Sequence, residues 1–404
     1  MPDLFPATSR GPARPRLAFV VSHPIQYYAP LHRRLAQRDD VAIKVFFTWH
    51  DGSRAVRDEG FQKEVTWDIP VTEGYEFEAI PNRARNPGTH RFFGLRNPGL
   101  LGRLLAWQPD AVHVTGYAYR SHLQALRSLH HLGIPVLFRG DSHLLDERRT
   151  GLRWRLKRLL LQAVFRLPAA FLYVGQANRA YYEAFGVSSD RLFHCPHTIE
   201  VERFAEPNGQ LEAQAAEWRK RLGIGPERWV LLFAGKFEDK KRPVTLMKAV
   251  QEITNSRLLL LMVGDGRLGD EVRSITQSAP DRFMVLPFQN QSRMPLVYRL
   301  ADCVVLPSAY GETWGLAVNE ALASGRPALV SDRVGCAQDL IRPGENGCVF
   351  RSDEWADFRV QLGTLMDVRW SERRDAIRAG ATNFSTAAGE SALIAALHNV
   401  ILAV

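Results

Sequence analysis

Residues 303–330 read CVVLPSAYGETWGLAVNEALASGRPALV. An apolar run at Cys303–Leu306 leads into a glycine-containing loop, and a run of helix-forming residues follows over Trp314–Ala323. A second apolar run covers Pro327–Val330. This order predicts a strand, a loop, a helix and a parallel strand, which is the repeating unit of a doubly wound α/β sheet.

The same alternation extends through both halves of the chain. In the second half we expect strands at Trp229–Ala234, Arg257–Val263 and Arg282–Pro287 and helices at Asn208–Arg221, Pro243–Ile253 and Met294–Leu300. In the first half we expect strands at Leu17–Val21, Ala42–Thr48, Ala111–Thr115, Pro135–Arg139 and Ala170–Val174 and helices at Pro30–Gln37, Arg120–Leu132 and Arg153–Phe165. The sequence therefore predicts two Rossmann-like domains that face each other across a ligand-binding cleft.

The domain limits follow from these runs, since 404 residues exceed one comfortable hydrophobic core. We expect a loose tail over residues 1–15, a first domain over 16–200 and a second over 205–384. An amphipathic helix at about 385–404 is expected to pack back on the first domain. Residues 49–98, rich in Pro, Gly and Asn, are expected to form extended loops around a short strand pair on a binding rim.

The positive charge of the chain is confined to its first half. Residues 1–200 carry 27 Lys and Arg against 18 Asp and Glu, whereas residues 201–404 carry 25 of each. This asymmetry indicates an anionic partner, such as a membrane surface, a phosphorylated acceptor or nucleic acid, unless it only reflects an Arg-rich proteome. We find no recognisable nucleic-acid-binding module and expect no nucleic acid partner.

A basic amphipathic helix is predicted around Arg153–Phe165, within a stretch that runs from Arg148 to Arg166. Either its cationic face binds anionic lipid, or its leucines pack in the core and its cations are simply solvated. The apolar runs are too short to span a bilayer. The four cysteines lack CxxC spacing, which is typical of reduced thiols, so we expect a cytoplasmic protein, peripheral at the inner face of the membrane if this helix binds lipid.

Two glutamates flank the start of the helix in the opening stretch. Glu312 precedes the helix and Glu320 lies about two turns inside it. Backbone N–H groups near Gly315 and Leu316 would point from the helix N-terminus into the cleft, which suits a diphosphate. The two carboxylates can then accept hydrogen bonds from hydroxyls at opposite ends of one ligand. A capped helix with one solvated glutamate is the plainer alternative.

Cations follow a glycine at the end of the first strand of the second domain. The segment FAGKFEDKKRP places Gly235 at the turn and Lys236 and Lys241 beyond it, with Lys240 and Arg242 as near alternatives. A solvated charge run is the simpler interpretation of this cluster. Its position at a strand end favours a phosphate-binding role.

A second glycine turn comprises Gly264, Gly266 and Gly269 after an apolar strand. This spacing also fits a dinucleotide-binding turn, which requires an acidic residue at the end of the next strand. That strand ends instead in Gln289 and Asn290, so hydride transfer is not expected.

Taken with their spacing, these motifs resemble those of the family-4 (group 1) retaining glycosyltransferases, in a bacterial subgroup. The resemblance implies the GT-B fold, with the donor sugar on Glu312 and the nucleotide ribose on Glu320. It places the donor diphosphate on Lys236 and Lys241, where the family usually has Arg and then Lys. Other donor contacts that it implies are Gly235, Gly264, Gly266, Leu286, Pro287, Phe288, Thr313, Trp314, Gly315 and Leu316, of which residues 286–288 correspond to the nucleobase contact.

In the first domain the resemblance is weaker. Many relatives hold a histidine against the donor sugar, and Arg139, Asp141 or His143 is expected to take that place. After the first strand, where the family often has a glycine-rich turn, His23, Gln26 and Tyr27 are candidate acceptor or cleft residues. The plainer alternative for each histidine is an ordinary surface side chain.

The function expected from this resemblance is retaining transfer of a sugar from a nucleotide diphosphate sugar to a glycan, glycolipid or small molecule, in cell-surface polysaccharide or glycoconjugate assembly. No cofactor and no metal is expected, because we find no DxD motif and no His/Asp cluster with metal spacing. Lysines would take over the role of a metal ion. The competing hypothesis is a non-catalytic sugar-nucleotide-binding subunit of a glycosylation complex.

Overall fold

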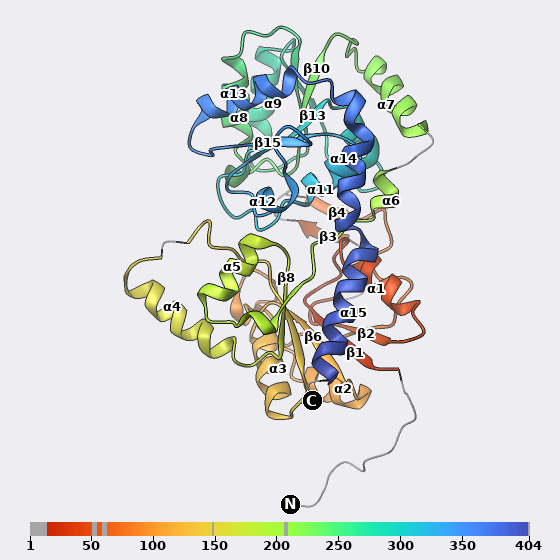
Figure 1. Ribbon diagram of the computed structural model, residues 1–404, viewed down its shortest axis with the longest axis vertical. Coiled ribbons are helices and arrows are strands. Elements are labelled where there is room, and N and C mark those ends of the chain that lie inside the picture. The colour runs from red at the N-terminus through yellow and green to blue at the C-terminus, as the bar shows by residue number, and fades with distance from the viewer. Residues whose placement is uncertain (1–13, 51–54, 59–62, 148, 206–208, 403–404) are drawn as a thin grey trace, which may run out of the picture.

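Two parallel sheets, one in each domain, organise the chain (Figure 1). The computed structural model describes residues 14–50, 55–58, 63–147, 149–205 and 209–402. Residues 1–13 of the expected tail lie outside the described part. The fold class predicted from the sequence, two doubly wound parallel α/β domains, is confirmed.

The first sheet has seven parallel strands in the order β5-β2-β1-β6-β7-β8-β9. Its strands are β1 (Arg16–Val21), β2 (Ala42–Phe47), β5 (Phe77–Ala79), β6 (Ala111–Thr115), β7 (Val136–Arg139), β8 (Ala170–Tyr173) and β9 (Leu192–His194). Successive side chains of β1 enter different cores: Ala18 and Val20 pack on one face, and Leu17 and Phe19 on the other. Both faces of the sheet are therefore covered, as an all-parallel sheet requires.

Helices on the two faces complete the first domain. One face carries α1 (Ala29–Ala36) and the C-terminal helix α15 (Thr386–Leu402). The other carries α2 (Leu100–Trp107), α3 (Arg120–His131), α4 (Gly151–Val164) and α5 (Gln176–Ala184). The expected packing of the C-terminal helix on the first domain is thus present, with the helix beginning at Thr386.

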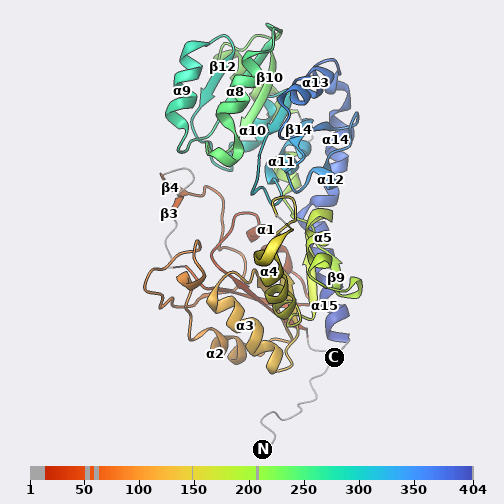
Figure 2. The same ribbon diagram turned by 90° about the vertical axis from the view of Figure 1, so that its left-hand side faces the viewer.

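The segment between β2 and β5 contains the expected short strand pair. Strands β3 (Ala55–Asp58) and β4 (Lys63–Thr66) pair antiparallel, separate from the main sheet. Figure 2 shows them beside the second domain rather than over their own sheet. The hairpin therefore brings a piece of the first domain to the cleft.

The second sheet has six parallel strands in the order β12-β11-β10-β13-β14-β15. They are β10 (Trp229–Ala234), β11 (Leu258–Val263), β12 (Phe283–Leu286), β13 (Cys303–Leu306), β14 (Ala328–Ser331) and β15 (Gly347–Phe350). The helices are α7 (Gln210–Arg221), α8 (Pro243–Gln251), α9 (Gly269–Ser278), α10 (Met294–Arg299), α11 (Leu316–Ala323), α12 (Ala337–Leu340), α13 (Trp355–Met366) and α14 (Arg374–Ala381). Short 3-10 turns are η1 (Phe92–Gly94), η2 (Ser189–Arg191), η3 (Asp239–Lys241), η4 (Trp370–Arg373) and η5 (Thr382–Phe384).

The chain crosses between the domains twice, and the crossings are hydrogen-bonded to each other. The first runs from β9 to α6 (Val201–Phe204), and the second joins η5 to α15. Ile199 N–H donates to the carbonyl of Phe384 at 3.1 Å, and Thr386 N–H donates to the carbonyl of Ile199 at 3.2 Å. A paired hinge of this kind fixes how the cleft-forming edges of the two sheets face each other.

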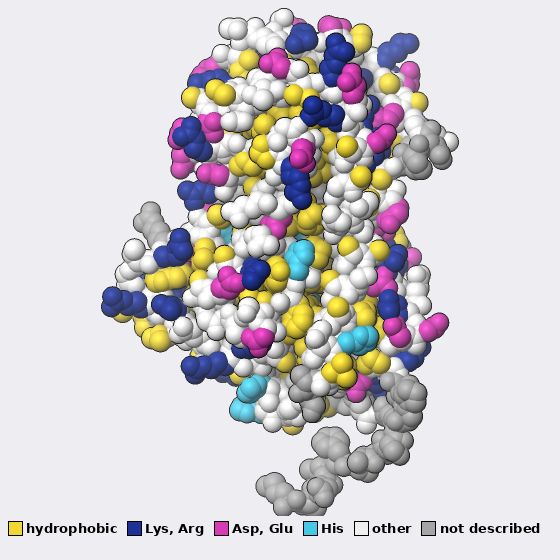
Figure 3. Space-filling model, viewed as in Figure 1, with side chains coloured by type: hydrophobic (Ala, Val, Ile, Leu, Met, Phe, Trp, Pro, Cys, Tyr) yellow, Lys and Arg dark blue, Asp and Glu magenta, His cyan; other side chains and the backbone are white. Residues whose placement is uncertain are grey.

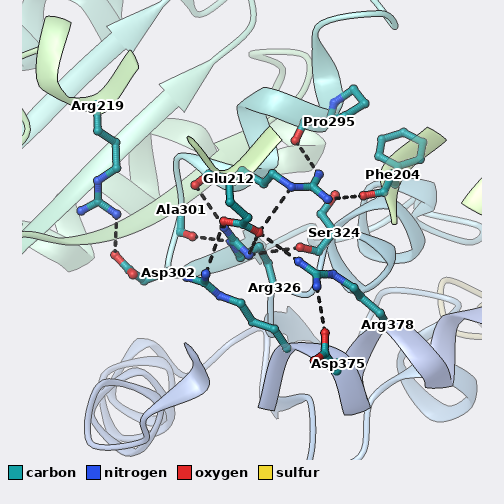
Figure 4. Close-up of polar contacts among 12 residues, drawn as sticks. Phe204, Glu212, Arg219, Pro295, Ala301, Asp302, Ser324, Arg326, Asp375 and Arg378 are labelled. Atoms are coloured by element: carbon teal, nitrogen blue, oxygen red, sulfur yellow. Dashed lines mark hydrogen bonds and ion pairs between the residues drawn. The ribbon is translucent and has the colours of Figure 1, made fainter. Parts of the chain in front are cut away.

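One carboxylate, Glu212 on α7, holds four guanidinium groups together behind α11 (Figure 4). Arg326, only 2% exposed, is bound through Nη2 at 2.7 Å, and Arg299, fully buried, through Nε at 3.4 Å. Arg374 and Arg378 of α14 approach the same carboxylate at 3.3 and 3.0 Å. The cluster ties α7, α10 and α14 to the end of α11, the helix that carries Glu320.

Candidate active site

A cavity of about 370 Å³ lies at the edges of the two sheets, between the domains. Residues of the first domain and the hinge contribute one wall: Gln26, Tyr27, Trp67, Asp141 and His197. Strand ends, the loops that follow them and residues of α10 and α11 in the second domain contribute the rest. Ligands bind at this edge in open α/β sheets, where the strand order reverses.

The floor of the cavity is the turn before α11. Gly315 has a φ of +103°, and a β-carbon at this position would lie 2.9 Å from side-chain atoms of both Leu306 and Val334. Only glycine fits this turn without displacing the core. The turn sets the start of α11 at Leu316, and Thr313, Trp314, Gly315 and Leu316 all line the cavity. The N-terminal N–H groups of the helix are therefore at the cavity wall.

Glu312 is held by a cation and a hydroxyl. Lys241 Nζ donates to Glu312 Oε2 at 2.7 Å, and Ser308 Oγ donates to the same oxygen at 3.0 Å. Burial alone would raise the pKa of this carboxyl, but Lys241 and Ser308 outweigh it and the pKa is lowered. Glu312 is thus an ionised, hydrogen-bonded acceptor in the cavity wall.

Glu320 lies in a different environment, although it lines the same cavity. Tyr298 Oη donates to Glu320 Oε2 at 2.7 Å, whereas Oε1 is buried without a hydrogen-bond partner. Burial raises the pKa of Glu320 to about 7, against the smaller effects of Tyr298 and Arg203. Glu320 lines the cavity, and its carboxylate has the capacity to accept a further hydrogen bond, such as one from a ligand hydroxyl.

Two glycine turns close the cavity beside the lysines. A β-carbon on Gly264 would lie 1.9 Å from the carbonyl oxygen of Gly235, so the turns after β10 and β11 approach too closely for any side chain there. Gly235, Lys236, Lys241 and Gly264 line the cavity. Gly266 does not: its N–H donates to Asp265 Oδ1 at 2.9 Å within the turn.

Of the three residues expected to contact the nucleobase, only one lies in the cavity wall. Phe288 lines the cavity, while Leu286 and Pro287 are not among its lining residues. The carbonyl of Leu286 accepts a hydrogen bond from Gly264 N–H at 3.3 Å, and that of Pro287 accepts one from Gln289 Nε2 at 3.0 Å. These two residues therefore hold the loop rather than reach into the cavity.

A family comparison agrees with the geometry of this half. Residues 214–383 match the model of the family described as glycosyl transferases group 1. The match covers most of the second domain, which we call the group 1 domain below.

The curated relatives that match this chain in sequence align with only about half of it. The D-inositol 3-phosphate glycosyltransferase of Nocardia farcinica is 31% identical over 212 residues, which are 50% of this chain and 45% of that protein. Its counterpart in Thermomonospora curvata is 28% identical over 235 residues, 55% of this chain and 54% of that protein. The chain spans about half the length of these relatives.

The likeness in structure covers both domains. Anabaena HepE, solved with UDP and glucose, has a TM-score of 0.68 at 15% identity, with 95% of this chain and 99% of that chain covered. A glycosyltransferase of Rickettsia africae has a TM-score of 0.73 at 11% identity, with 96% and 99% covered. At these identities the comparison shows the fold, which is GT-B, as the resemblance implied.

Opposite the group 1 domain, the loop after β7 supplies Asp141 to the cavity. Thr313 Oγ1 donates to Asp141 Oδ2 at 2.8 Å, so this loop is bonded to the segment that carries Glu312. Arg139 lies elsewhere: its guanidinium donates to the carbonyls of Cys195 and Pro196 at 2.9 and 3.2 Å. The expectation that Arg139 reaches the donor sugar is therefore corrected, because the hinge engages its guanidinium.

His143 and His23 also lie outside the cavity lining. His143 Nε2 is 3.3 Å from the backbone carbonyl of Glu312, a contact that supports the loop of the group 1 domain from behind. His23 Nδ1 is 3.0 Å from Ser22 Oγ, and burial lowers its pKa. Gln26 and Tyr27, the other two candidates after β1, do line the cavity.

Several cavity residues had no expected role in the sequence. Trp67 follows β4, and the neighbouring Asp68 accepts a hydrogen bond from Ser292 N–H at 3.1 Å in the group 1 domain. Asn290 Nδ2 donates to the carbonyl of Thr66 at 2.7 Å, so a two-point contact crosses the cleft. Other lining residues without an expected role include His197, Gln289, Gln291, Met294 and Tyr298.

His197 is a neutral side chain at the hinge. Burial, followed by Arg139, lowers its pKa to about 3. Its ring lies 5.8 Å from that of Trp314 and 6.3 Å from that of Tyr28, so it packs between aromatic groups of the two domains. Among the described side chains, no three of His, Cys, Asp and Glu are placed together so that they could hold a metal ion.

Proposed function

We propose that the chain is a retaining, metal-independent glycosyltransferase that moves a sugar from a nucleotide diphosphate sugar to a glycan, glycolipid or small-molecule hydroxyl. We place this reaction in cell-surface polysaccharide or glycoconjugate assembly. One observation carries the proposal: the Lys241–Glu312 pair and Glu320, whose Oε1 has no hydrogen-bond partner in the protein, line one cavity at the start of α11. One ligand could therefore bind its diphosphate to Lys241 and its hydroxyl groups to the carboxylates of Glu312 and Glu320.

The donor spans the second domain in this proposal. Its diphosphate lies against Lys236, Lys241 and the first N–H groups of α11, and its ribose hydroxyls bond to Glu320. UDP is the first nucleotide to test, since HepE, which has the same fold, was solved with UDP and glucose. Phe288 and Trp67 both line the cavity and are the aromatic side chains that we assign to the base.

The main task of the catalyst is to stabilise the negative charge that develops on the leaving nucleotide diphosphate. Fixed lysines and helix N–H groups stabilise that charge without reorganisation, and such preorganised electrostatics is usually the largest catalytic term. As the bond from the anomeric carbon to the leaving phosphate oxygen breaks, the acceptor oxygen bonds to the same face of that carbon. The leaving phosphate oxygen takes the acceptor's proton.

Glu312 orients the donor sugar rather than acting as a base. A carboxylate whose pKa is held down by Lys241 and Ser308 is a weak proton acceptor. It remains a good acceptor of hydrogen bonds from sugar hydroxyls. The acceptor approaches from the first-domain wall, where Gln26, Tyr27 and Asp141 present polar groups.

The test is to titrate the full chain with UDP, GDP and ADP in a calorimeter, and then to measure donor hydrolysis with the matching sugar nucleotide. Binding of one nucleotide with slow release of free sugar in the anomeric configuration of the donor, read by NMR, supports the proposal. Binding without any turnover, with or without candidate acceptors, favours the non-catalytic subunit instead. Failure to bind any nucleotide diphosphate overturns both.

A further inference from the structure

Helix α4 projects from the side of the first domain (Figure 1). Only one side of it is attached: Leu161 and Val164 are buried in the domain core, and the Trp154 ring lies 5.2 Å from that of Phe185. The opposite side of the helix faces away from the protein. Sequence alone left open whether the cationic face of this helix binds anionic lipid or its leucines pack in the core with the cations solvated.

The leucines on the outer side are exposed to solvent. Leu152, Leu156, Leu159 and Leu160 are 72%, 57%, 65% and 61% exposed. Their spacing of four, three and one residues places them in one stripe along a helix. Among the eleven exposed large apolar side chains of the described residues, these four lie within 14 residues, so the stripe is a patch and not scattered exposure.

Cations border this stripe on both sides. Arg153 lies along one edge and Arg155 along the other, Arg158 lies further round the helix on the same flank as Arg155, and all three are exposed. Arg149 and Arg166 extend the positive charge beyond the two ends, and α4 itself contains no Asp or Glu. Lys157, on the inner side, is bonded to Glu147. Figure 3 shows basic and hydrophobic side chains together where α4 projects.

We propose that α4 is a membrane-docking helix that lies in the surface of an anionic lipid bilayer. Its leucine stripe enters the boundary between headgroups and acyl chains, and the flanking arginines bind lipid phosphates. Such binding requires an exposed apolar stripe flanked by cations on a helix whose opposite side is packed on the protein, and α4 has this arrangement. This surface lies outside the donor cavity, and the proposal does not depend on the transfer reaction.

A second copy of the chain fits this surface less well. In a two-fold contact the same patch faces itself, so the arginines of one α4 would oppose those of the other. With no acid on the helix to offset them, these like charges repel each other. A bilayer with anionic headgroups supplies the opposite charge and a continuous apolar phase.

The experiment is flotation of the full-length protein with phosphatidylcholine vesicles, with and without phosphatidylglycerol. We expect binding only to the anionic vesicles. It should weaken sharply between about 0.1 M and about 1 M salt, as the Debye length falls from about 10 Å to about 3 Å. Equal binding to neutral vesicles, or none to either, overturns the proposal.

Paired variants separate the two contributions. Arg155→Gln with Arg158→Gln should lower the partition coefficient roughly 30-fold, about five-fold for each cation. Leu156→Gln with Leu159→Gln should lower it by at least about ten-fold. The matched control is Val360→Gln, which replaces a residue that is 64% exposed on α13 of the other domain and should leave binding unchanged.

Folding and self-association are followed in the same samples. Donor binding and thermal midpoint should be unchanged in all variants, because the replaced side chains are exposed and outside the cavity. Light scattering should report a concentration-independent mass. A dimer that the leucine pair abolishes, together with vesicle binding that the pair leaves intact, would refute membrane docking and assign the stripe to a second copy.

Discussion

Lys241 donates a hydrogen bond of 2.7 Å to Glu312, and the two side chains come from different loops at the edge of the second sheet. The Lys241 and Glu312 side chains are only 16% and 15% exposed. They can therefore interact only with the protein and with a ligand bound in the cavity. A lysine has three donors, and only one is needed by Glu312. The remaining donors can meet a phosphate while Glu312 stays in place to hold a sugar hydroxyl.

Replacing Lys241 with Ala should lower turnover at least about a hundredfold, as loss of a comparable donor to a developing anion does. Steady-state hydrolysis or transfer at saturating donor measures this. The matched control is Lys240→Ala, since Lys240 is bonded to Glu238 and is absent from the cavity lining. Near-normal turnover of the Lys241 variant would remove this lysine from the catalytic site.

Glu320 should make donor affinity depend on pH. Its pKa of about 7 means that the carboxylate form, which accepts ribose hydroxyls, grows as pH rises from 6 to 8. The affinity for UDP-glucose, whose diester phosphates do not titrate in this range, should rise up to about ten-fold across that interval. Calorimetry at both pH values measures it. Glu320→Gln should bind weakly with no such rise, and a wild-type profile as flat as that of the variant would contradict the assignment.

The same group should reduce stability at high pH. The folded pKa of Glu320 exceeds its ordinary value of 4.5, so the folded chain holds this proton more tightly than the unfolded chain. The contribution of Glu320 to stability is complete below pH 4.5 and is lost as pH rises through about 7. Glu320→Gln should therefore gain up to about 3 kcal/mol relative to wild type between pH 5 and pH 8, measured by urea unfolding.

Glu312→Gln is the opposite case and serves as the control for that measurement. The pKa of Glu312 is lowered in the folded chain, so its contribution to stability is present above pH 4.5 and lost on acidification. At pH 8 the Glu312 variant should be less stable than wild type. Shifts of the same sign in both variants would mean that the two carboxyls do not differ in environment.

Much of the central architecture was predictable from apolar runs bounded by glycine and proline. The predicted strands Trp229–Ala234 and Cys303–Leu306 coincide with β10 and β13. They were predictable because a parallel strand buried on both faces consists of an almost unbroken run of hydrophobic residues. The two edge strands of the first sheet, β5 and β9, were missed. Phe77–Ala79 and Leu192–His194 are three residues each and only partly buried, so their sequences carry little periodic signal.

The donor half of the site was easier to predict than the acceptor half. Glu312, Glu320 and Lys241 lie in continuous motifs whose spacing is set by one strand, one turn and one helix. Tyr298 reaches Glu320 from α10, and Trp67 reaches the cavity from the far domain. Such contacts depend on how the sheets and domains meet. Arg139 was misplaced for the same reason: its hinge partners, Cys195 and Pro196, are more than fifty residues away.

Trp67 should contribute to nucleotide binding even though it belongs to the first domain. It lines the same cavity as Phe288, and Asp68 beside it is bonded to Ser292. If Trp67 covers the base, Trp67→Ala should weaken UDP at least about five-fold, and Trp67→Phe should restore most of the loss, because stacking requires only an aromatic face. Equal affinity of both variants and wild type would place the base elsewhere. Asp68→Ala should weaken binding to a smaller extent, through loss of the contact that holds Trp67 over the cleft.

Glu212 should be a stability residue that acts on the site through α11. Its removal leaves the buried guanidinium groups of Arg299 and Arg326 without their carboxylate, and breaking a buried ion pair typically costs about 3 to 5 kcal/mol. Because Glu212 is itself 28% exposed and solvent can partly replace it, we expect about 3 kcal/mol for Glu212→Ala, by urea unfolding.

Glu217→Ala is the matched control for this substitution, because Glu217 is an exposed residue of the same helix. Its stability should stay within about 0.5 kcal/mol of wild type. If the cluster fixes the end of α11, the Glu212 variant should also bind UDP more weakly at temperatures where it remains folded, because Glu320 and the N–H groups of that helix shift together. A large loss of stability with unchanged affinity would show that the arginine cluster supports the domain without positioning the donor site.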